Sequence, residues 1–286
     1  MQIRNVHLKA KFQLKGAELT NLIEIDSGQE FIWQADPTHW ARHTPLLFPF
    51  VGRLKNDQYS YQGKTYQMGQ HGFARDMDFE IETHSETSIT FLLKSTEETL
   101  TKYPFEFELR VEYVLQGKSL ITRYHVLNAS QDEMYFSIGG HPAFKCAITL
   151  AGKRSDYHLL FNKNETASIH LLEDGNFNGE TDQVLDGNQL LITDDLFERD
   201  ALVFKDLKST NVSLVSIDRK WLKFHYQGFP YLGIWSKNSR SPFVCIEPWF
   251  GLADQANHDG DLTKKEGIQT LVSGKTFTCD YKIEIE

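Results

Sequence analysis

The stretch Phe105-Glu-Phe-Glu-Leu-Arg-Val-Glu-Tyr-Val-Leu115 alternates apolar and polar side chains with a period of two. Successive side chains of a strand point to opposite faces, so this pattern predicts a strand with one buried and one wet face. The turn sequence Gln116-Gly-Lys-Ser119 follows, and Leu120 to Leu127 returns as a second apolar run. Together the two runs predict a β-hairpin.

Short apolar runs recur along the rest of the chain, separated by Gly, Asn, Asp and Ser. They lie at residues 13–14, 19–25, 31–33, 66–68, 89–93, 158–161, 201–204, 212–216, 221–226, 231–235, 243–246 and 277–286. A sheet with one apolar face has to pack that face against another layer. We therefore expect an all-β fold with little helix, built as one large antiparallel β-sandwich. No repeat or linker divides the sequence, so residues 1–286 are expected to form a single domain.

Three segments depart from the strand pattern. Residues 95–102 predict one short helical turn, with Ser95 and Glu98 as its capping box and Pro104 ending it. Residues 36–45 are expected to hold another single turn. The polar stretch from Leu172 to Asp195 is expected to be a long surface loop.

The composition narrows the range of partners. The 286 residues are 40% hydrophobic and 24% charged, which is typical of a globular protein. A formal net charge of −9 argues against a nucleic acid or an anionic membrane, because both attract a basic surface. A small molecule remains the expected partner, and the sequence does not indicate an oligomeric state.

The cysteines and the N-terminus indicate a compartment. Cys146, Cys245 and Cys279 are widely spaced in apolar surroundings and form no CxxC pair, so we expect reduced, buried thiols without a zinc site. The first residues lack the apolar core of a signal peptide, and no window approaches the roughly 18 apolar residues of a spanning helix. The sequence therefore predicts a cytoplasmic protein.

Three short stretches carry residues suited to proton transfer. Ser137-Ile-Gly-Gly-His-Pro-Ala-Phe144 holds His141 between two glycines and a proline, which allow a sharp bend or a close approach by a ligand. Gln70-His-Gly-Phe-Ala-Arg75 offers a second histidine and an arginine, and Cys245-Ile-Glu-Pro-Trp-Phe-Gly251 offers a carboxylate. An acid, a base and an orienting cation are the groups that proton-transfer chemistry needs.

The order of four motifs resembles the aldose 1-epimerase (galactose mutarotase-like) family. The motifs are Phe48-Pro-Phe-Val-Gly-Arg53, His71-Gly-Phe-Ala-Arg75, Gly140-His-Pro142 and Ile246-Glu-Pro-Trp249. Their form is most similar to the LacX-like branch, and the resemblance extends over essentially the whole chain. It implies a β-sandwich whose cleft binds a hexose and interconverts its α and β anomers, without a metal or an organic cofactor.

The resemblance implies that His141 is the acid and Glu247 the base of ring opening. The chemistry of the residues agrees, because a histidine with a pKa of about 6.5 exchanges protons readily near neutrality. A glutamate becomes an effective base when apolar neighbours raise its pKa, and Glu247 lies between Ile246 and Pro248.

The resemblance also implies a set of substrate-binding residues. Arg53 and His71 match positions that hold sugar hydroxyls, and Arg75 matches one that contacts phosphate in hexose-6-phosphate epimerases. Asp200 is the candidate for binding a distal hydroxyl. Independently of the resemblance, Trp249 is a candidate for a wall or stacking surface, because an aromatic ring suits a concave site. Three nearby carboxylates compete with Asp200 for its role: Asp194, Asp195 and Glu198.

Other interpretations remain open at this stage. Taken alone, each of these histidines and carboxylates also fits a structural role, such as a turn histidine or a surface ion pair. The protein could bind or sense a sugar with little turnover, or act on hexose 6-phosphates. A cupin-like metalloenzyme would use His71, His141 and Glu247 as ligands, but two histidines about 70 residues apart are not the close-set pair that usually anchors such sites.

Overall fold

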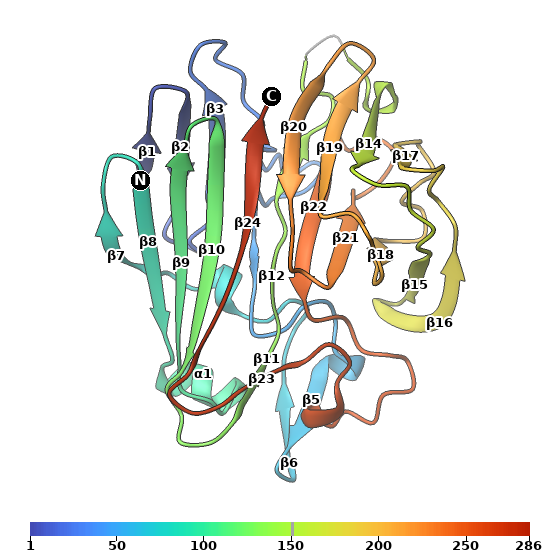
Figure 1. The fold of residues 1–286 in the computed structure, drawn as a ribbon. Helices are drawn as coiled ribbons and strands as arrows, with labels where there is room; N and C mark the ends of the chain where they lie inside the picture. Colours follow the sequence, from blue (N-terminus) through green and yellow to red (C-terminus); the bar gives the residue numbers. More distant parts are fainter. Residues whose placement is uncertain (150–151) are drawn as a thin grey trace.

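The computed structural model describes residues 1–149 and 152–286. Across these ranges the chain forms antiparallel strands that build two large sheets, and one apolar core draws residues from both (Figure 1). The expected all-β sandwich with little helix is confirmed. Among the described residues, no helix has both the length and the apolar character that crossing a membrane requires.

Sheet A contains nine strands within the described ranges, and the predicted hairpin lies in its interior, two strands from one edge. In spatial order they are β17 (Gln189–Leu191), β14 (Tyr157–Phe161), β19 (Asn211–Ser216), β20 (Lys220–His225), β24 (Thr276–Ile285), β10 (Ser119–Asn128), β9 (Phe107–Gln116), β8 (Ser88–Lys94) and β7 (Glu80–His84).

Sheet B contains eight strands, counted over the same ranges. Its path runs through β16 (Asn176–Asp182), β15 (Ile169–Glu173), β18 (Leu202–Phe204), β21 (Tyr231–Trp235), β22 (Phe243–Phe250), β12 (Ile138–Gly140) and β4 (Leu46–Leu47), and β13 (Ala143–Lys145) also pairs with β22.

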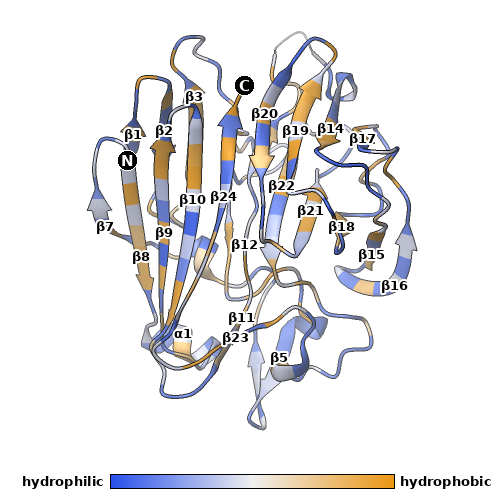
Figure 2. Cartoon of the chain, viewed as in Figure 1, coloured by the Kyte–Doolittle hydropathy of each residue, from blue (hydrophilic) through white to orange (hydrophobic). Residues whose placement is uncertain are grey.

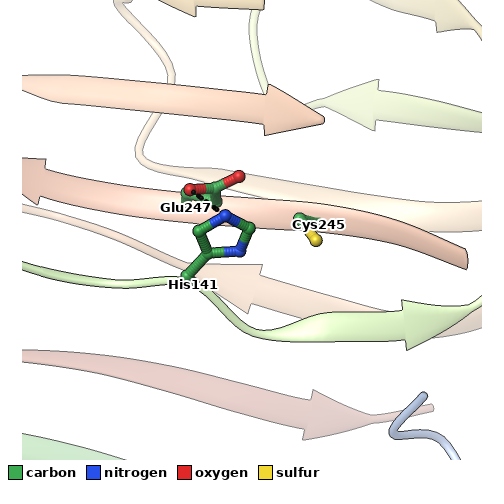
Figure 3. A group of neighbouring side chains, drawn as sticks. All are labelled: His141, Cys245 and Glu247. Atoms are coloured by element: carbon green, nitrogen blue, oxygen red, sulfur yellow. Dashed lines mark ion pairs between the residues drawn. The ribbon is translucent and has the colours of Figure 1, made fainter. Parts of the chain in front are cut away.

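Smaller elements complete the described structure. A three-stranded sheet contains β1 (Gln2–Arg4), β2 (Leu8–Phe12) and β3 (Leu19–Glu24). Two further pairs are β5 (Gln58–Tyr61) with β6 (Lys64–Gln67), and β11 (Met134–Phe136) with β23 (Gln269–Leu271). The α-helix α1 (Glu97–Lys102) lies near the β5–β6 hairpin at the lower end of Figure 1, and 3-10 turns occupy Lys55–Asp57, Ala74–Asp76, Arg154–Asp156 and Leu262–Lys264.

The hairpin of β9 and β10 forms as its periodicity predicts. Leu115 pairs with Leu120 across the turn, and every second residue along β9 is buried. Figure 2 shows the resulting bands of apolar and polar residues along these strands of sheet A. The apolar face packs into the core between the two sheets, which fixes the register because a one-residue slip would expose it.

Strand β22 of sheet B is buried on both faces, and its two sets of side chains serve different purposes. Val244 and Ile246 belong to the main core between the sheets. Cys245 and Trp249 face the opposite side, where they join two smaller apolar clusters. Since side chains alternate along a strand, Glu247 faces that same outer side of sheet B.

Several local expectations were wrong. The stretch from Leu172 to Asp195 is not a loop throughout, because β16 pairs with β15 and β17 pairs with β14 at the sheet edges. Ladder hydrogen bonds come from the backbone, so a polar edge strand forms without apolar alternation. Residues 13–14 lie just beyond β2, and residues 31–33 take part in an isolated bridge through Ile32 and not in a named strand.

The short helix begins one residue later than expected. Thr96, not Ser95, caps α1, and its hydroxyl accepts from the backbone N–H of Thr99. Glu98, expected as the other half of the capping box, instead pairs with Lys102 at 2.8 Å. The turn expected in residues 36–45 is present, with Trp40 N–H donating to the Asp36 carbonyl.

Candidate active site

A cavity of about 520 Å³ opens on the outer face of sheet B. This volume lies within the range of about 300–1,000 Å³ that is common for small-molecule sites. Strands β15, β16, β18, β21 and β22 contribute to its walls. The lining residues are Trp40, Gly52, Gln70, His71, Arg75, His141, Leu172, Gly175, Phe177, Phe197, Glu198, Asp200, Ala201, Val203, Trp235, Lys237, Glu247, Trp249 and Ala253.

The strand register brings His141 opposite Glu247. Gly139 of β12 pairs with Trp249 of β22, and Ala143 of β13 pairs with Cys245. His141 and Glu247 lie midway between these two pairs, where the chain between β12 and β13 interrupts the ladder. Directly opposed residues of antiparallel strands point to the same face, so both side chains face the cavity.

The imidazole and the carboxylate meet at the bottom of the cavity. His141 Nε2 lies 3.2 Å from Glu247 Oε2, and the two residues are only 6% and 1% exposed (Figure 3). The contact lacks hydrogen-bond alignment, and His141 Nδ1 and Glu247 Oε2 have no hydrogen-bond partner within the described part of the chain. Buried polar atoms normally have partners, so this pair is available to a ligand.

Burial shifts the pKa of each group in the direction that favours its uncharged form. The pKa of Glu247 is raised well above 4.5, mainly because desolvation penalises the carboxylate and secondarily because Asp200 is nearby. The pKa of His141 is lowered to about 3, mainly by desolvation and further by the positive charges of Arg75 and Arg42. Both shifts favour the arrangement in which His141 is neutral and Glu247 keeps its proton.

Aromatic rings enclose His141. Trp40 stacks on the imidazole, with ring centres 4.9 Å apart, and Trp235 meets it edge-on at 5.6 Å. Trp33 Nε1 donates to the Trp40 backbone carbonyl at 2.9 Å, which holds that segment in place. Trp235 ends β21 and Lys237 follows it, and neither belongs to a motif, so only the tertiary packing places them at the site.

His71 is held in one tautomer. The Gly52 N–H donates to His71 Nδ1 at 3.1 Å, so Nε2 carries the ring proton of the neutral imidazole. Burial, followed by the charges of His141, Arg75 and Arg42, keeps the pKa of His71 well below 6.5. His71 also has a φ of 66°, which fixes its unusual backbone direction at the cavity wall. It can donate a hydrogen bond to a ligand oxygen without carrying charge.

Arg75 presents a largely buried guanidinium to the cavity. Its Nη2 donates to the Gln70 carbonyl at 2.7 Å. Its Nε is buried without a hydrogen-bond partner among the described residues and lies 3.7 Å from Asp76 Oδ2. Desolvation, with a smaller contribution from Arg42, lowers its pKa to about 10, so it remains charged at neutral pH.

The structure does not bring Arg53 into the cavity with the other candidates. Its guanidinium binds Asp57, four residues later, at 2.8 Å, and its side chain is 43% exposed. Gly175, which does line the cavity, packs on its aliphatic part. Arg53 is therefore positioned to support a neighbouring loop and does not face the pair of His141 and Glu247.

Asp200 and Trp249 do lie at the cavity. Asp200 lies at its exposed rim with a φ of 71°, and its Oδ1 accepts from the Ala201 N–H. Of the three competing carboxylates, Glu198 lines the cavity, whereas Asp194 and Asp195 do not appear among the described lining residues. The Trp249 ring lies across Gly233 of β21, where an added Cβ would approach it to 2.4 Å.

One cluster of potential metal ligands overlaps this site. The donor atoms of His141, Cys245 and Glu247 all lie within 4.8 Å of one another, and among the described residues no other such cluster is found. His71 is not part of it, so the ligand set of the cupin-like alternative does not assemble.

The sandwich and its outer cavity define a galactose mutarotase-like protein. The chain belongs to the aldose 1-epimerase family, whose family model matches residues 1–269. It is 35% identical to the chromosomal LacX protein of Lactococcus lactis subsp. lactis, over 100% of this chain and 99% of that one.

Two solved structures show the same fold over the whole of this chain. A galactose mutarotase related enzyme from Lactobacillus acidophilus is 39% identical, with a TM-score of 0.96 and 97% of its chain covered. A galactose mutarotase-like protein from Lactobacillus casei is 34% identical, with a TM-score of 0.94 and 99% covered.

Proposed function

We propose that this protein interconverts the α and β anomers of a hexose, with His141 and Glu247 as its acid and base. The observation that carries the proposal is the buried 3.2 Å contact between these two groups at a cavity of sugar-binding size. Family membership supports the reaction class.

The three cysteines are free in the described structure, which supports our further proposal that the protein works in a reducing compartment, the cytoplasm.

The proposed reaction transfers one proton in each direction. Glu247 takes the proton of the C1 hydroxyl while protonated His141 donates one to the ring oxygen, and the ring C–O bond breaks to give the open-chain aldehyde. Rotation about C1–C2 then presents the other aldehyde face. Glu247 returns its proton to the aldehyde oxygen and His141 recovers the other as the ring closes, so the pair ends with the proton count it began with.

Burial suits the pair for this exchange. The charge-separated form, with Glu247 ionised and His141 protonated, contains the same single proton as the neutral form. Desolvation raises the pKa of one group and lowers that of the other, which disfavours the charge-separated form in the free site. A bound sugar places its hydroxyl dipoles beside both groups. The pair can then pass between its neutral and its charge-separated form without exchanging a proton with solvent. The proposed chemistry requires no cofactor because it consists of proton transfers alone.

Other cavity residues are proposed to orient the sugar. The His71 Nε2–H can donate to an oxygen near the reacting end, and the Arg75 guanidinium can donate to a second oxygen. Asp200 and Glu198 at the rim can accept from hydroxyls farther along the ring. Trp249 supplies an apolar wall for the sugar's C–H face.

A phosphorylated hexose is the second candidate substrate. The buried Nε of Arg75 has no hydrogen-bond partner in the described residues, and its ion-pair contact with Asp76 is long, at 3.7 Å. Lys237 also lines the cavity. Two cations at one cavity favour an anionic group on the ligand.

Anomer exchange measured by NMR on free and 6-phosphorylated hexoses tests both candidates. The proposal predicts exchange faster than the spontaneous rate for at least one sugar, and a fall of about 10²–10⁴ in Glu247→Gln. Glu284→Gln is the matched control, since Glu284 contacts His225 at 2.7 Å on sheet A, away from the cavity. A phosphate preference that disappears in Arg75→Ala would select the second candidate, and binding without exchange would leave a sugar-binding module.

A further inference from the structure

The outer face of β22 presents a thiol next to the proposed base. Cys245 and Glu247 are two residues apart, so their side chains project from the same face of the strand. His141 approaches them from the facing chain segment, and Figure 3 shows its ring beside the strand that carries Cys245 and Glu247. The three donor atoms lie within 4.8 Å of one another.

The cluster has free donor capacity as well as proximity. Each of the three residues is more than nine-tenths buried, and His141 Nδ1 and Glu247 Oε2 lack hydrogen-bond partners in the described structure. His141 and Glu247 line the cavity, which gives a cation a route from solvent. Cys245 is not a lining residue in the described ranges and lies among Trp33, Ala143 and Phe243.

The donor set selects a particular class of cation. One sulfur, one imidazole nitrogen and one carboxylate oxygen are ligands that Zn²⁺ and Cd²⁺ accept together, whereas Mg²⁺ and Ca²⁺ prefer oxygen alone. Three protein ligands also match the number in zinc sites that keep a fourth position open.

We propose that His141, Cys245 and Glu247 form an inhibitory site for a zinc-like divalent cation. Binding uses the two groups that the anomer exchange proposed above requires, so the cation and a reacting sugar exclude each other. This regulatory consequence rests on the proposed function, while cation binding does not.

The charges of such a complex balance in the buried site. The Cys245 thiol and the Glu247 carboxyl each release a proton on binding Zn²⁺, and neutral His141 contributes a lone pair. The dication, the thiolate and the carboxylate then sum to zero, which limits the cost of burying charge. Arg42 and Arg75 act on His141 and oppose a cation, whereas Asp200 acts on Glu247 and favours one.

Cadmium and zinc titrations of the chelator-treated full chain test the site directly. We expect one equivalent of Cd²⁺ to produce thiolate-to-metal absorption in the ultraviolet, and Zn²⁺ binding measured by calorimetry to weaken at least about tenfold in Cys245→Ala. Cys146→Ala and Cys279→Ala are matched controls, because both remove a free, buried cysteine elsewhere in the fold. If Cys245→Ala fails to fold, the absorption band in the wild type and its loss in Cys245→Ser still decide the question.

Inhibition of exchange separates this proposal from the proposed function. Zn²⁺ should inhibit wild-type exchange competitively with sugar, and at least about tenfold more Zn²⁺ should be needed in Cys245→Ala, which keeps its basal exchange. Zn²⁺ binding that is absent, or equally tight in Cys245→Ala, would overturn the metal site even if exchange is fast. Cys245-dependent binding by a protein that exchanges no sugar would uphold the metal site and remove the proposed function.

Discussion

At the scale of single residues, the proposed site depends on the carboxyl group of Glu247, which is buried in apolar surroundings. Burial raises the pKa of Glu247 well above 4.5. Within the described structure no Lys or Arg lies in ion-pair contact with it, and its recorded contact is with the imidazole of His141. Ionisation of a buried carboxyl lowers the free energy of unfolding, because the charge is poorly solvated in the folded protein. Active sites commonly accept that cost in exchange for reactivity.

Replacing Glu247 with Gln should therefore stabilise the protein, and more so as pH rises. In the unfolded chain this carboxyl loses its proton near pH 4.5, while in the folded protein it keeps the proton to a higher pH. Between the two pKa values the unfolded state binds fewer protons, so wild-type stability falls with rising pH, by at most about 1.4 kcal/mol per pH unit. Glu247→Gln lacks this loss.

Thermal unfolding from pH 5 to pH 8, in buffers containing a chelator, would measure the difference. The gap in Tm between Glu247→Gln and the wild type should widen across this range. Glu106→Gln, which changes an exposed carboxylate that forms no ion pair among the described residues, should show no such trend. A constant gap, or one that narrows as pH rises, would contradict the raised pKa.

Most of the residues that the sequence offered as candidates line one cavity, whereas several of their neighbours there could not be predicted. His141, Glu247, His71, Arg75, Asp200 and Trp249 were all expected at one site, and all line the cavity. Arg53 was expected with them, but Asp57 holds it at the surface, and this i,i+4 pair was visible in the sequence. Trp235 could not be found in advance, because only the folded chain brings it to His141.

At the scale of elements, the pairing of β21 with β22 shapes the cavity. Gly233 of β21 pairs with Glu247, and the ring of Trp249 lies over the space that a side chain at Gly233 would fill. The glycine therefore lets the indole lie flat along the sheet and leaves room above the carboxyl.

Gly233→Ala should destabilise the protein and disturb the cavity. An added Cβ would lie 2.4 Å from the Trp249 ring, which is too close for either group to stay in place. Overpacking of this kind costs about 1–3 kcal/mol. Chemical denaturation would measure the loss, and sugar binding should weaken in parallel because Trp249 has to move.

Gly69→Ala is the matched control, since nothing lies within 4 Å of a Cβ at that position. The two variants make the same chemical change in different surroundings. Equal stability of the two would show that the contact between Gly233 and Trp249 has no energetic importance.

Strands were predictable where their side chains alternate between apolar and polar or form a continuous apolar run. The hairpin of β9 and β10 was read from its alternation, and β22 was recognised as a short apolar run. Strands β16 and β17 were missed because they lie at sheet edges, where backbone pairing suffices and side chains remain polar. The capping residue of α1 was displaced by one position, since several hydroxyl residues compete there.

At the scale of the whole molecule, one core cluster joins both large sheets. It contains Leu109 and Ile283 from sheet A, Ile234 and Ile246 from sheet B, and Leu22 from the N-terminal sheet. The fold class followed from the periodicity of the strands. The order of strands in each sheet did not, because it depends on contacts between residues far apart in sequence.

We propose that residues 1–286 unfold as one domain, as the shared core suggests. Tryptophan fluorescence reports mainly on the cavity side, where Trp40, Trp235 and Trp249 lie, while far-UV circular dichroism reports on all strands. The two urea transitions should coincide. Two separated transitions would show that the chain contains independently unfolding parts.

The central claim is that His141 and Glu247 act as one proton-transfer unit, and a double-mutant cycle on the NMR exchange rate tests it most directly. Because neither group is useful without the other, His141→Asn and Glu247→Gln should each remove most of the exchange, and the double variant should be about as slow as the slower single variant. The parallel cycle with His225→Asn and Glu284→Gln, a contacting pair outside the cavity, should leave exchange unchanged. Single effects that multiply in the double variant, or wild-type exchange in Glu247→Gln, would contradict the claim.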